Sequence, residues 1–427
     1  MIIVIWSSIL MVAVLGLLAS ASRRGTLPPD ALLFAAVWTA LFVVASLLGG
    51  VYMTDPTPVL LVAANLALWG IGYFLIFTAP GRPTASFAEA ELEFPLLGKF
   101  IVISALIGMI SPILFAQRLG VDFSQVTDLN QYFDTVSTAN SEIRQQVVEE
   151  GFLSKICVSF NLAAAVALGI YLATQHTSRY DKILKVLLVV FPGILTTAST
   201  SVRSSTLMPI IFIVSGYIAG QVLTQRHRNL LTVRNVARVT IFVLLFSIFV
   251  VFFQMIRLGT VGTYVIASTL NHLRPWVAGY LPAFSGWYNR SWDGSLALGL
   301  NTFHGVANAF GVEGEGISQY LTGWYIGNGQ SSNAATVIRV FVADFGIVGS
   351  LIFCFAWGAA SAWLSRSTAR LSNVALPLLA VNIATIIWSP DGWLLGYGSR
   401  LLSIFVLLAY FGLAPRVRFR DPTPAYG

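Results

Sequence analysis

The chain has 427 residues, of which 56% are hydrophobic and 10% are charged, and its mean hydropathy is +0.78. Soluble domains carry about 25% charged residues, so this composition excludes an ordinary soluble fold and indicates a surface that faces lipid. The net charge of +7 does not indicate nucleic-acid binding, because the basic residues lie in short clusters between apolar segments, as topology signals do.

Eleven apolar segments predict membrane spans, each of which takes about 20 residues as an α-helix. The first is predicted to be a retained span rather than a signal peptide, because no basic region precedes it. A re-entrant hairpin is the alternative to two full spans for residues 183–199 and 206–223. The predicted fold is therefore all-α, a polytopic membrane helical bundle that forms a single transmembrane domain over residues 1–427. The predicted spans are 2–21, 30–49, 58–79, 99–116, 152–174, 183–199, 206–223, 238–256, 334–364, 373–389 and 398–415.

The distribution of basic residues predicts the orientation of these spans. With the N-terminus outside, the inside segments hold 16 of the 25 basic residues and six of the 18 acidic residues. Cytoplasmic loops are enriched in Lys and Arg, so we expect an outside N-terminus and a cytoplasmic C-terminus.

Two outside segments are longer than connectors. Residues 117–151 have apolar positions at helical spacing and predict an amphipathic outer helix. Residues 257–333 are rich in Gly and aromatic residues and form the predicted large outer loop, with short helices. Long connections of this kind usually carry function.

Arginines on the outer side are the main candidates for binding, because the topology rule argues against them. Arginine pairs with phosphate through two parallel hydrogen bonds. Arg203 lies in a hydroxyl-rich break between two apolar runs, Arg257 opens the large segment, and Arg339 lies within a span. The alternatives are an interfacial anchor for the first two and a structural pair for Arg339, with Asp344 expected to be structural. Arg290 and Arg400 complete the set of arginines predicted to bind an anion.

The large segment also offers aromatic rings and candidate bases. Rings with polar handles suit sugars, although they also concentrate at membrane interfaces. A general base needs a pKa near the working pH, which favours His304 over Asp293 and Glu315, and a hydrogen-bonded structural His is the alternative. The predicted sugar-binding residues are Trp287, Tyr288, Trp292 and Trp324.

Several motifs are absent from the sequence. It contains no P-loop, no HExxH and no Cys/His cluster, and Cys157 and Cys354 have no metal-ligand spacing. No acidic pair follows the first span closely. We therefore predict no metal and no cofactor, with arginines supplying the positive charge.

Two stretches resemble the O-antigen polymerase family, the Wzy-type oligosaccharide repeat-unit polymerases. One is the turn Ser201-Val202-Arg203-Ser204-Ser205, where the family usually has Gly-Ser-Arg. The other is Asn333-Ala334-Ala335-Thr336, followed by Asp344-Phe345-Gly346-Ile347-Val348-Gly349. The number of spans and the late outer loop are similar to that family as well.

The resemblance implies a GT-C-like membrane glycosyltransferase of the bacterial plasma (inner) membrane. Its donor and acceptor would be oligosaccharides linked to undecaprenyl pyrophosphate, which it would polymerise into O-antigen or another surface polysaccharide of the lipopolysaccharide type. The arginines would bind the pyrophosphate, and His304, Asp293 or Glu315 would deprotonate the acceptor. The lipid bilayer and a chain-length regulator are the implied partners.

Two rival functions remain open at this point. An O-antigen ligase would transfer the glycan from the same carrier to the lipid A core. A lipid-linked oligosaccharide flippase or other transporter would show internal repeats and polar positions near the midplane of both halves, which the sequence lacks.

Overall fold

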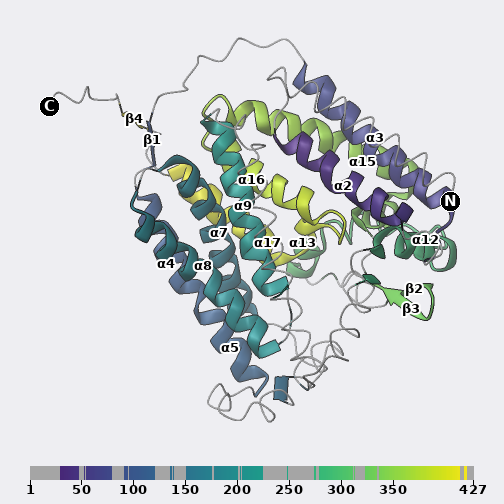
Figure 1. Cartoon of the computed structure of the whole chain (residues 1–427), viewed down its shortest axis with the longest axis horizontal. Helices are drawn as coiled ribbons and strands as arrows, with labels where there is room; N and C mark the ends of the chain where they lie inside the picture. Colours follow the sequence, from purple (N-terminus) through teal and green to yellow (C-terminus); the bar gives the residue numbers. More distant parts are fainter. Residues whose placement is uncertain are drawn as a thin grey trace. The chain divides into compact units, whose positions relative to one another are not determined.

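Helices make up most of the described part of the protein in the computed structural model (Figure 1). The structure describes residues 29–47, 52, 54–78, 91–94, 96–120, 135, 136, 138, 151–175, 177–200, 202, 204–224, 248, 274, 275, 278–310, 312, 323–333, 336–413 and 418–420. The predicted span 2–21 lies outside these residues, as does the span 238–256 apart from residue 248, and most of the predicted outer helix in 117–151.

Six of the described helices are long and apolar enough to cross a membrane. They are α3 (Pro56–Phe77), α4 with α5 (Leu97–Gly108 and Ile110–Arg118), α7 (Phe152–Thr174), α8 (Arg179–Thr200), α9 (Ser204–Leu223) and α15 (Thr336–Thr368). Three shorter apolar helices are α2 (Pro29–Leu47), α16 (Ala375–Trp388) and α17 (Gly398–Leu413). The prediction of an all-α membrane protein is confirmed at this level. Helices α8 and α9 each have the length of a full span, which does not favour a re-entrant hairpin.

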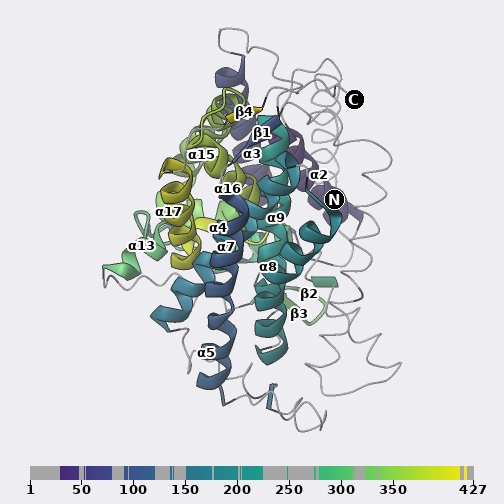
Figure 2. The same cartoon turned by 90° about the vertical axis from the view of Figure 1, so that its left-hand side faces the viewer.

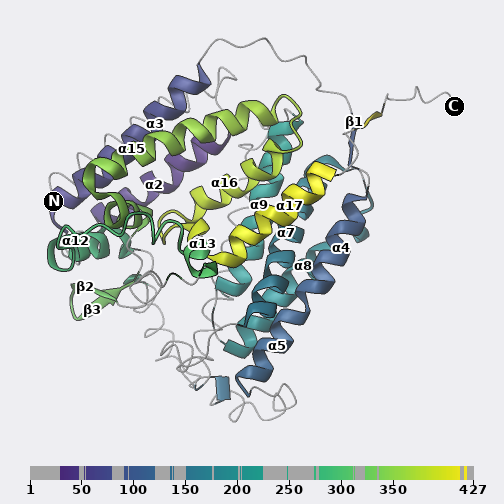
Figure 3. The same cartoon turned by 180° about the vertical axis from the view of Figure 1, so that it is seen from behind.

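The described helices group into two compact units, and the first combines Met1–Ala85 with His272–Leu401. It contains α2, α3, α15 and α16 together with short elements from the large segment and from the connection between α16 and α17. In this unit α3 lies alongside α15 (Figures 1 and 3) because glycines allow close approach. A Cβ added to Gly358 would lie 1.9 Å from the Trp69 carbonyl oxygen. The short elements are α12 (Tyr280–Arg290), α13 (His304–Ala309), the hairpin β2–β3 (Trp324–Gly327 and Gln330–Ser332) and a 3₁₀ turn, η3 (Leu394–Gly396).

Polar contacts join the helix ends of the first unit in two groups. The buried Asp30 carboxylate at the start of α2 accepts hydrogen bonds from Tyr73 near the end of α3 (3.0 Å) and Ser365 near the end of α15 (2.8 Å). At the other ends, the Asp55 amide donates to Ser285 Oγ in α12 (2.8 Å). Helix α2 therefore runs opposite to α3 and α15, which is the relation that the predicted succession of spans gives for spans 30–49, 58–79 and 334–364.

The second unit combines Ser86–Asn271 with Leu402–Gly427 and contains α4, α5, α7, α8 and α9 (Figure 2). Helices α7 and α9 pack through Gly169 and Gly216, where an added Cβ would lie 2.1 Å from the Ile213 oxygen or 2.2 Å from the Val166 oxygen. A short antiparallel ladder pairs β1 (Glu91–Glu93) with β4 (Arg418–Arg420). Small residues at helix contacts are typical of packing in lipid, where close van der Waals contact replaces the hydrophobic effect.

Candidate functional site

Residues 389–397 form a loop that joins α16 to α17. Other elements of the first unit are hydrogen-bonded to this loop. The Val337 amide in the first turn of α15 donates to the Ser389 carbonyl (2.8 Å). Trp393 Nε1 donates to the Thr302 carbonyl (3.0 Å) just before α13. Figure 3 shows α13 beside the helix ends that this loop joins. The loop therefore gathers residues from α13, α15, α16 and α17 at one place.

Arg400, one of the predicted arginines, lies at this loop. The Arg400 guanidinium lies 3.8 Å from the ring centroid of Tyr397 and 5.5 Å from that of Trp388, and it donates to the Leu394 carbonyl (3.4 Å). Burial raises the pKa of Tyr397, whereas the positive charges of Arg400 and Arg339 lower it. Both guanidinium groups therefore act electrostatically on one hydroxyl, although they come from different helices.

Arg339 is buried beneath aromatic rings. Its side chain is 3% exposed, and its guanidinium lies 4.4 Å from the ring centroid of Trp324 in the hairpin and 5.9 Å from that of Trp287 in α12. Ring faces attract a guanidinium through the quadrupole without cancelling its charge. The site therefore places a buried guanidinium close to aromatic side chains.

The four predicted sugar-binding residues lie together. Trp292 is 5.1 Å from Tyr288 and 6.2 Å from Trp287 between ring centroids, and both Trp287 and Trp324 lie beside Arg339. Trp287 is 4% exposed, and the side chains of Trp292 and Trp324 are half-buried. These rings form a continuous cluster in the first unit, next to the buried cation.

Asp344 supports the site rather than forming part of it. Its carboxylate accepts hydrogen bonds from the Asn301 amide (3.1 Å), Asn301 Nδ2 (2.8 Å) and the Thr302 amide (2.5 Å). These bonds agree with the structural role predicted for Asp344. Gly346, two residues later, has φ +69° and interrupts the helical backbone of α15, a conformation that glycine adopts without strain.

The other predicted residues lie apart from this place or outside the described part. Arg290 is exposed, with its guanidinium 5.6 Å from the ring of Tyr325. Asp293 is exposed and accepts a hydrogen bond from the Ser295 amide (2.9 Å), and the interaction with Ser295 lowers its pKa. His304 begins α13 and is half-buried, next to Gly305, which packs against Gly398. The predicted residues outside the described part are Arg203, Arg257 and Glu315.

Three residues that the sequence analysis did not select also belong to this place. They are Asp391 and Tyr397 of the loop and Tyr280 at the start of α12. Burial raises the pKa of Asp391 to about 6, with Arg400 opposing the shift. Burial also raises the pKa of Tyr280, and the negative charge of Asp391 adds to that shift. One feature of the sequence could have identified Asp391: it is the single acidic residue in the short predicted loop between two predicted spans, 373–389 and 398–415, that contain no acidic residue.

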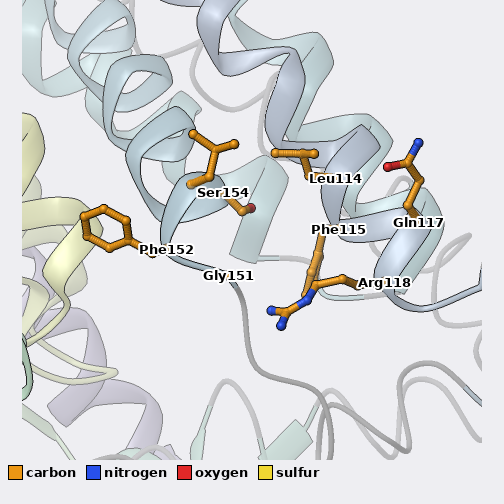
Figure 4. A pocket seen from close by; sticks show the side chains of 8 residues that line it. Leu114, Phe115, Gln117, Arg118, Gly151, Phe152 and Ser154 are labelled. Carbon is orange, nitrogen blue, oxygen red and sulfur yellow. The ribbon is translucent and has the colours of Figure 1, made fainter.

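The second unit has a cavity of its own, of about 450 Å³, at the end of α5 and the start of α7 (Figure 4). Arg118, Gln117 and Ser154 are its polar side chains, and none of the predicted site residues lines it. Its lining residues are Leu114, Phe115, Gln117, Arg118, Gly151, Phe152, Leu153 and Ser154.

Comparison with known protein families, curated proteins and solved structures found no match to this chain. Within the described ranges, no three His, Cys, Asp or Glu side chains come together as metal ligands. Inference about function therefore depends on the sequence and on the geometry at the 389–397 loop.

Proposed function

We propose that the protein is a membrane glycosyltransferase that polymerises undecaprenyl-pyrophosphate-linked oligosaccharide repeat units into a surface polysaccharide. The observation that carries this proposal is the position of Arg339 and Arg400. Both guanidinium groups lie against aromatic rings, and both act on the Tyr397 hydroxyl. A pair of permanent cations beside a cluster of Trp and Tyr rings suits a ligand that joins a pyrophosphate to sugars.

The chemistry of glycosyl transfer explains why such a site would accelerate the reaction. When the bond from the anomeric carbon to the pyrophosphate breaks, negative charge develops on the leaving oxygen. Cations held in place before the reaction stabilise this charge without reorganisation, and removing one such group typically costs about 10²–10³-fold in rate. In this proposal Arg339 and Arg400 take the role that a metal ion has in many phosphate-sugar transferases.

The remaining features of the proposal concern the membrane. The chain would lie in a bacterial plasma membrane with about eleven spans and a GT-C-like arrangement, with its N-terminus outside and its C-terminus in the cytoplasm. The 389–397 loop and the large segment would then face the outer side, where lipid-linked repeat units are assembled. The alternation of helix directions in the first unit supports a common side for these two segments.

The test uses the purified full chain and a short undecaprenyl-pyrophosphate-linked repeat unit without divalent metal, followed by gel analysis of the products. The wild type should give a ladder. Arg339→Ala and Arg400→Ala should lower the initial rate by about 10²–10³-fold. Arg370→Ala, an exposed arginine beyond the far end of α15, is the matched control and should keep the wild-type rate.

Three results would contradict the proposal in different ways. A ladder that survives both substitutions would remove these arginines from the site. Transfer to a lipid A core acceptor without a ladder would indicate the ligase. No covalent product, with movement of the intact lipid-linked sugar across vesicle membranes, would indicate the transporter.

A further inference from the structure

Polymerisation needs a group that takes the proton of the attacking hydroxyl, and this base must lie in the same site as the cations that bind the leaving group, within reach of that hydroxyl. We propose that Asp391, in the loop between α16 and α17, is this catalytic base. The inference rests on the proposed function and identifies a residue outside the long outer segment in which the sequence analysis sought the base.

The geometry of the loop places Asp391 in the site. Its amide donates to the Trp388 carbonyl (2.9 Å), which fixes the turn, and Arg400 lies 5.5 Å from the Trp388 ring at the other side of the loop. The preceding Ser389 is bonded to the first turn of α15, which carries Arg339 two residues further on. Asp391 therefore lies on the backbone segment that contacts Arg400 and is bonded to the first turn of α15.

The carboxylate of Asp391 is also available to a ligand. In the part of the chain that the structure describes, no hydrogen bond to this carboxylate is formed, whereas the carboxylate of Asp344 accepts three. The side chain is half-buried rather than enclosed. A carboxylate that is partly desolvated and not used for structure can accept a proton from a substrate.

The charges that face Asp391 set its proton affinity. Arg400 faces it from the first turn of α17, Tyr397 from the end of the loop and Tyr280 from α12. Burial raises the pKa of Asp391 to about 6, the largest effect, and Arg400 lowers it. A base with a pKa slightly below neutral is ionised at pH 7 and still has affinity for a proton, which is the optimum for general-base catalysis.

Asp293 differs from Asp391 in each of these respects. It is exposed, its carboxylate is used by the Ser295 amide, and its pKa is lowered. Asp293 has the same charge as Asp391 but a lower proton affinity and an exposed carboxylate. It is therefore a suitable residue with which to compare the pH dependence of the Asp391 variants. His304 approaches the same loop from α13 and is tested separately, because an imidazole titrates in the same pH range as Asp391.

The reaction step is balanced as follows. The acceptor hydroxyl oxygen forms a bond to the anomeric carbon of the donor, and the bond from that carbon to the pyrophosphate oxygen breaks. The electron pair of the broken bond leaves with undecaprenyl pyrophosphate beside Arg339 and Arg400. The hydroxyl proton passes to the Asp391 carboxylate and then to solvent.

The experiment compares wild type, Asp391→Asn, Asp293→Asn and His304→Gln in the polymerisation assay from pH 5 to pH 9, with the binding of undecaprenyl pyrophosphate measured on each variant. Asp391→Asn should lower kcat by about 10²–10⁴-fold with the binding of the lipid unchanged. It should also remove the acid limb of the rate profile, which has its midpoint near pH 6 in the wild type. Asp391→Glu should restore part of the rate, and Asp293→Asn should keep the acid limb of the rate profile.

Each contrary result has a definite meaning. If the wild type polymerises and Asp391→Asn keeps at least half of the wild-type rate, Asp391 is not the base, and the proposed function is unaffected. Loss of lipid binding in a folded Asp391→Asn variant assigns the residue to positioning Arg400 instead of catalysis. An acid limb that disappears only in His304→Gln transfers the role to the histidine. A wild type without any ladder overturns the proposed function itself.

Discussion

The contact between α3 and α15 gives a sharp prediction about how the first unit is held together. A Cβ added to Gly72 would lie 2.1 Å from the Phe355 carbonyl oxygen, whereas ordinary van der Waals contact begins at 3.4 Å. The two helices would have to separate by the difference, about 1.3 Å, because the opposing atom is backbone and cannot rotate away. Overpacking of this kind costs about 1–3 kcal/mol.

Gly70 is the matched control for this substitution. It lies in the same helix, and an added Cβ there would have no heavy atom within 4 Å. Alanine in place of glycine favours a helix by about 1 kcal/mol at either position. The difference between Gly72→Ala and Gly70→Ala therefore isolates the packing cost, and we expect Gly72→Ala to be less stable than Gly70→Ala by about 1–3 kcal/mol.

The measurement is the free energy of unfolding in mixed detergent micelles, followed by far-UV circular dichroism. Gly358→Ala, whose Cβ would lie 1.9 Å from the Trp69 oxygen, should be destabilised in the same way. The double variant Gly72→Ala/Gly358→Ala should cost less than the sum, because the first substitution already separates the helices. Equal stability of Gly72→Ala and Gly70→Ala would refute the close approach of α3 and α15.

Three further predictions concern buried polar groups. Asp344→Ala should lower the free energy of unfolding by at least about 3 kcal/mol, because three donors lose their acceptor; a loss below 1 kcal/mol in the same micelle titration would contradict this. Asp30→Ala should lower it by about 1–3 kcal/mol and Asp30→Asn by less, because the amide oxygen still accepts a hydrogen bond; equal losses would show that these bonds do not stabilise the unit. The Asp391 carboxyl titrates near 3.8 when unfolded and near 6 when folded, so between these values the folded state keeps a proton that the unfolded state releases. Stability should therefore fall as the pH rises from about 4 to about 6, by at most about 3 kcal/mol, and Asp391→Asn should remove that slope.

The helices were predictable because they follow from local sequence. Apolar runs of about 20 residues have no stable alternative to a helix in lipid, since every backbone polar group must be satisfied within the segment. The predicted spans 152–174 and 206–223 coincide with α7 and α9 to within two residues. The break in α15 at Gly346 was not predicted, because an isolated glycine in an apolar run is compatible with an uninterrupted helix.

The site was predictable only in part, because its residues converge through tertiary packing. Arg339 and Arg400 were selected one at a time from the topology rule, and their common action on Tyr397 depends on how α15 and α17 meet the 389–397 loop. Asp391 was missed because the short loop that carries it has no motif, and the burial that raises its proton affinity comes from distant residues.

The way Arg339 is buried bears on how an anionic ligand would bind there. Trp324 and Trp287 lie with their rings 4.4 Å and 5.9 Å from the guanidinium, and their faces orient it. Lysine at this position would keep the charge but lose both the ring stacking and the planar fork. Arg339→Lys should therefore weaken the binding of undecaprenyl pyrophosphate more than Arg370→Lys does. Equal binding by the two variants would mean that charge alone, without this aromatic support, accounts for recognition at the site.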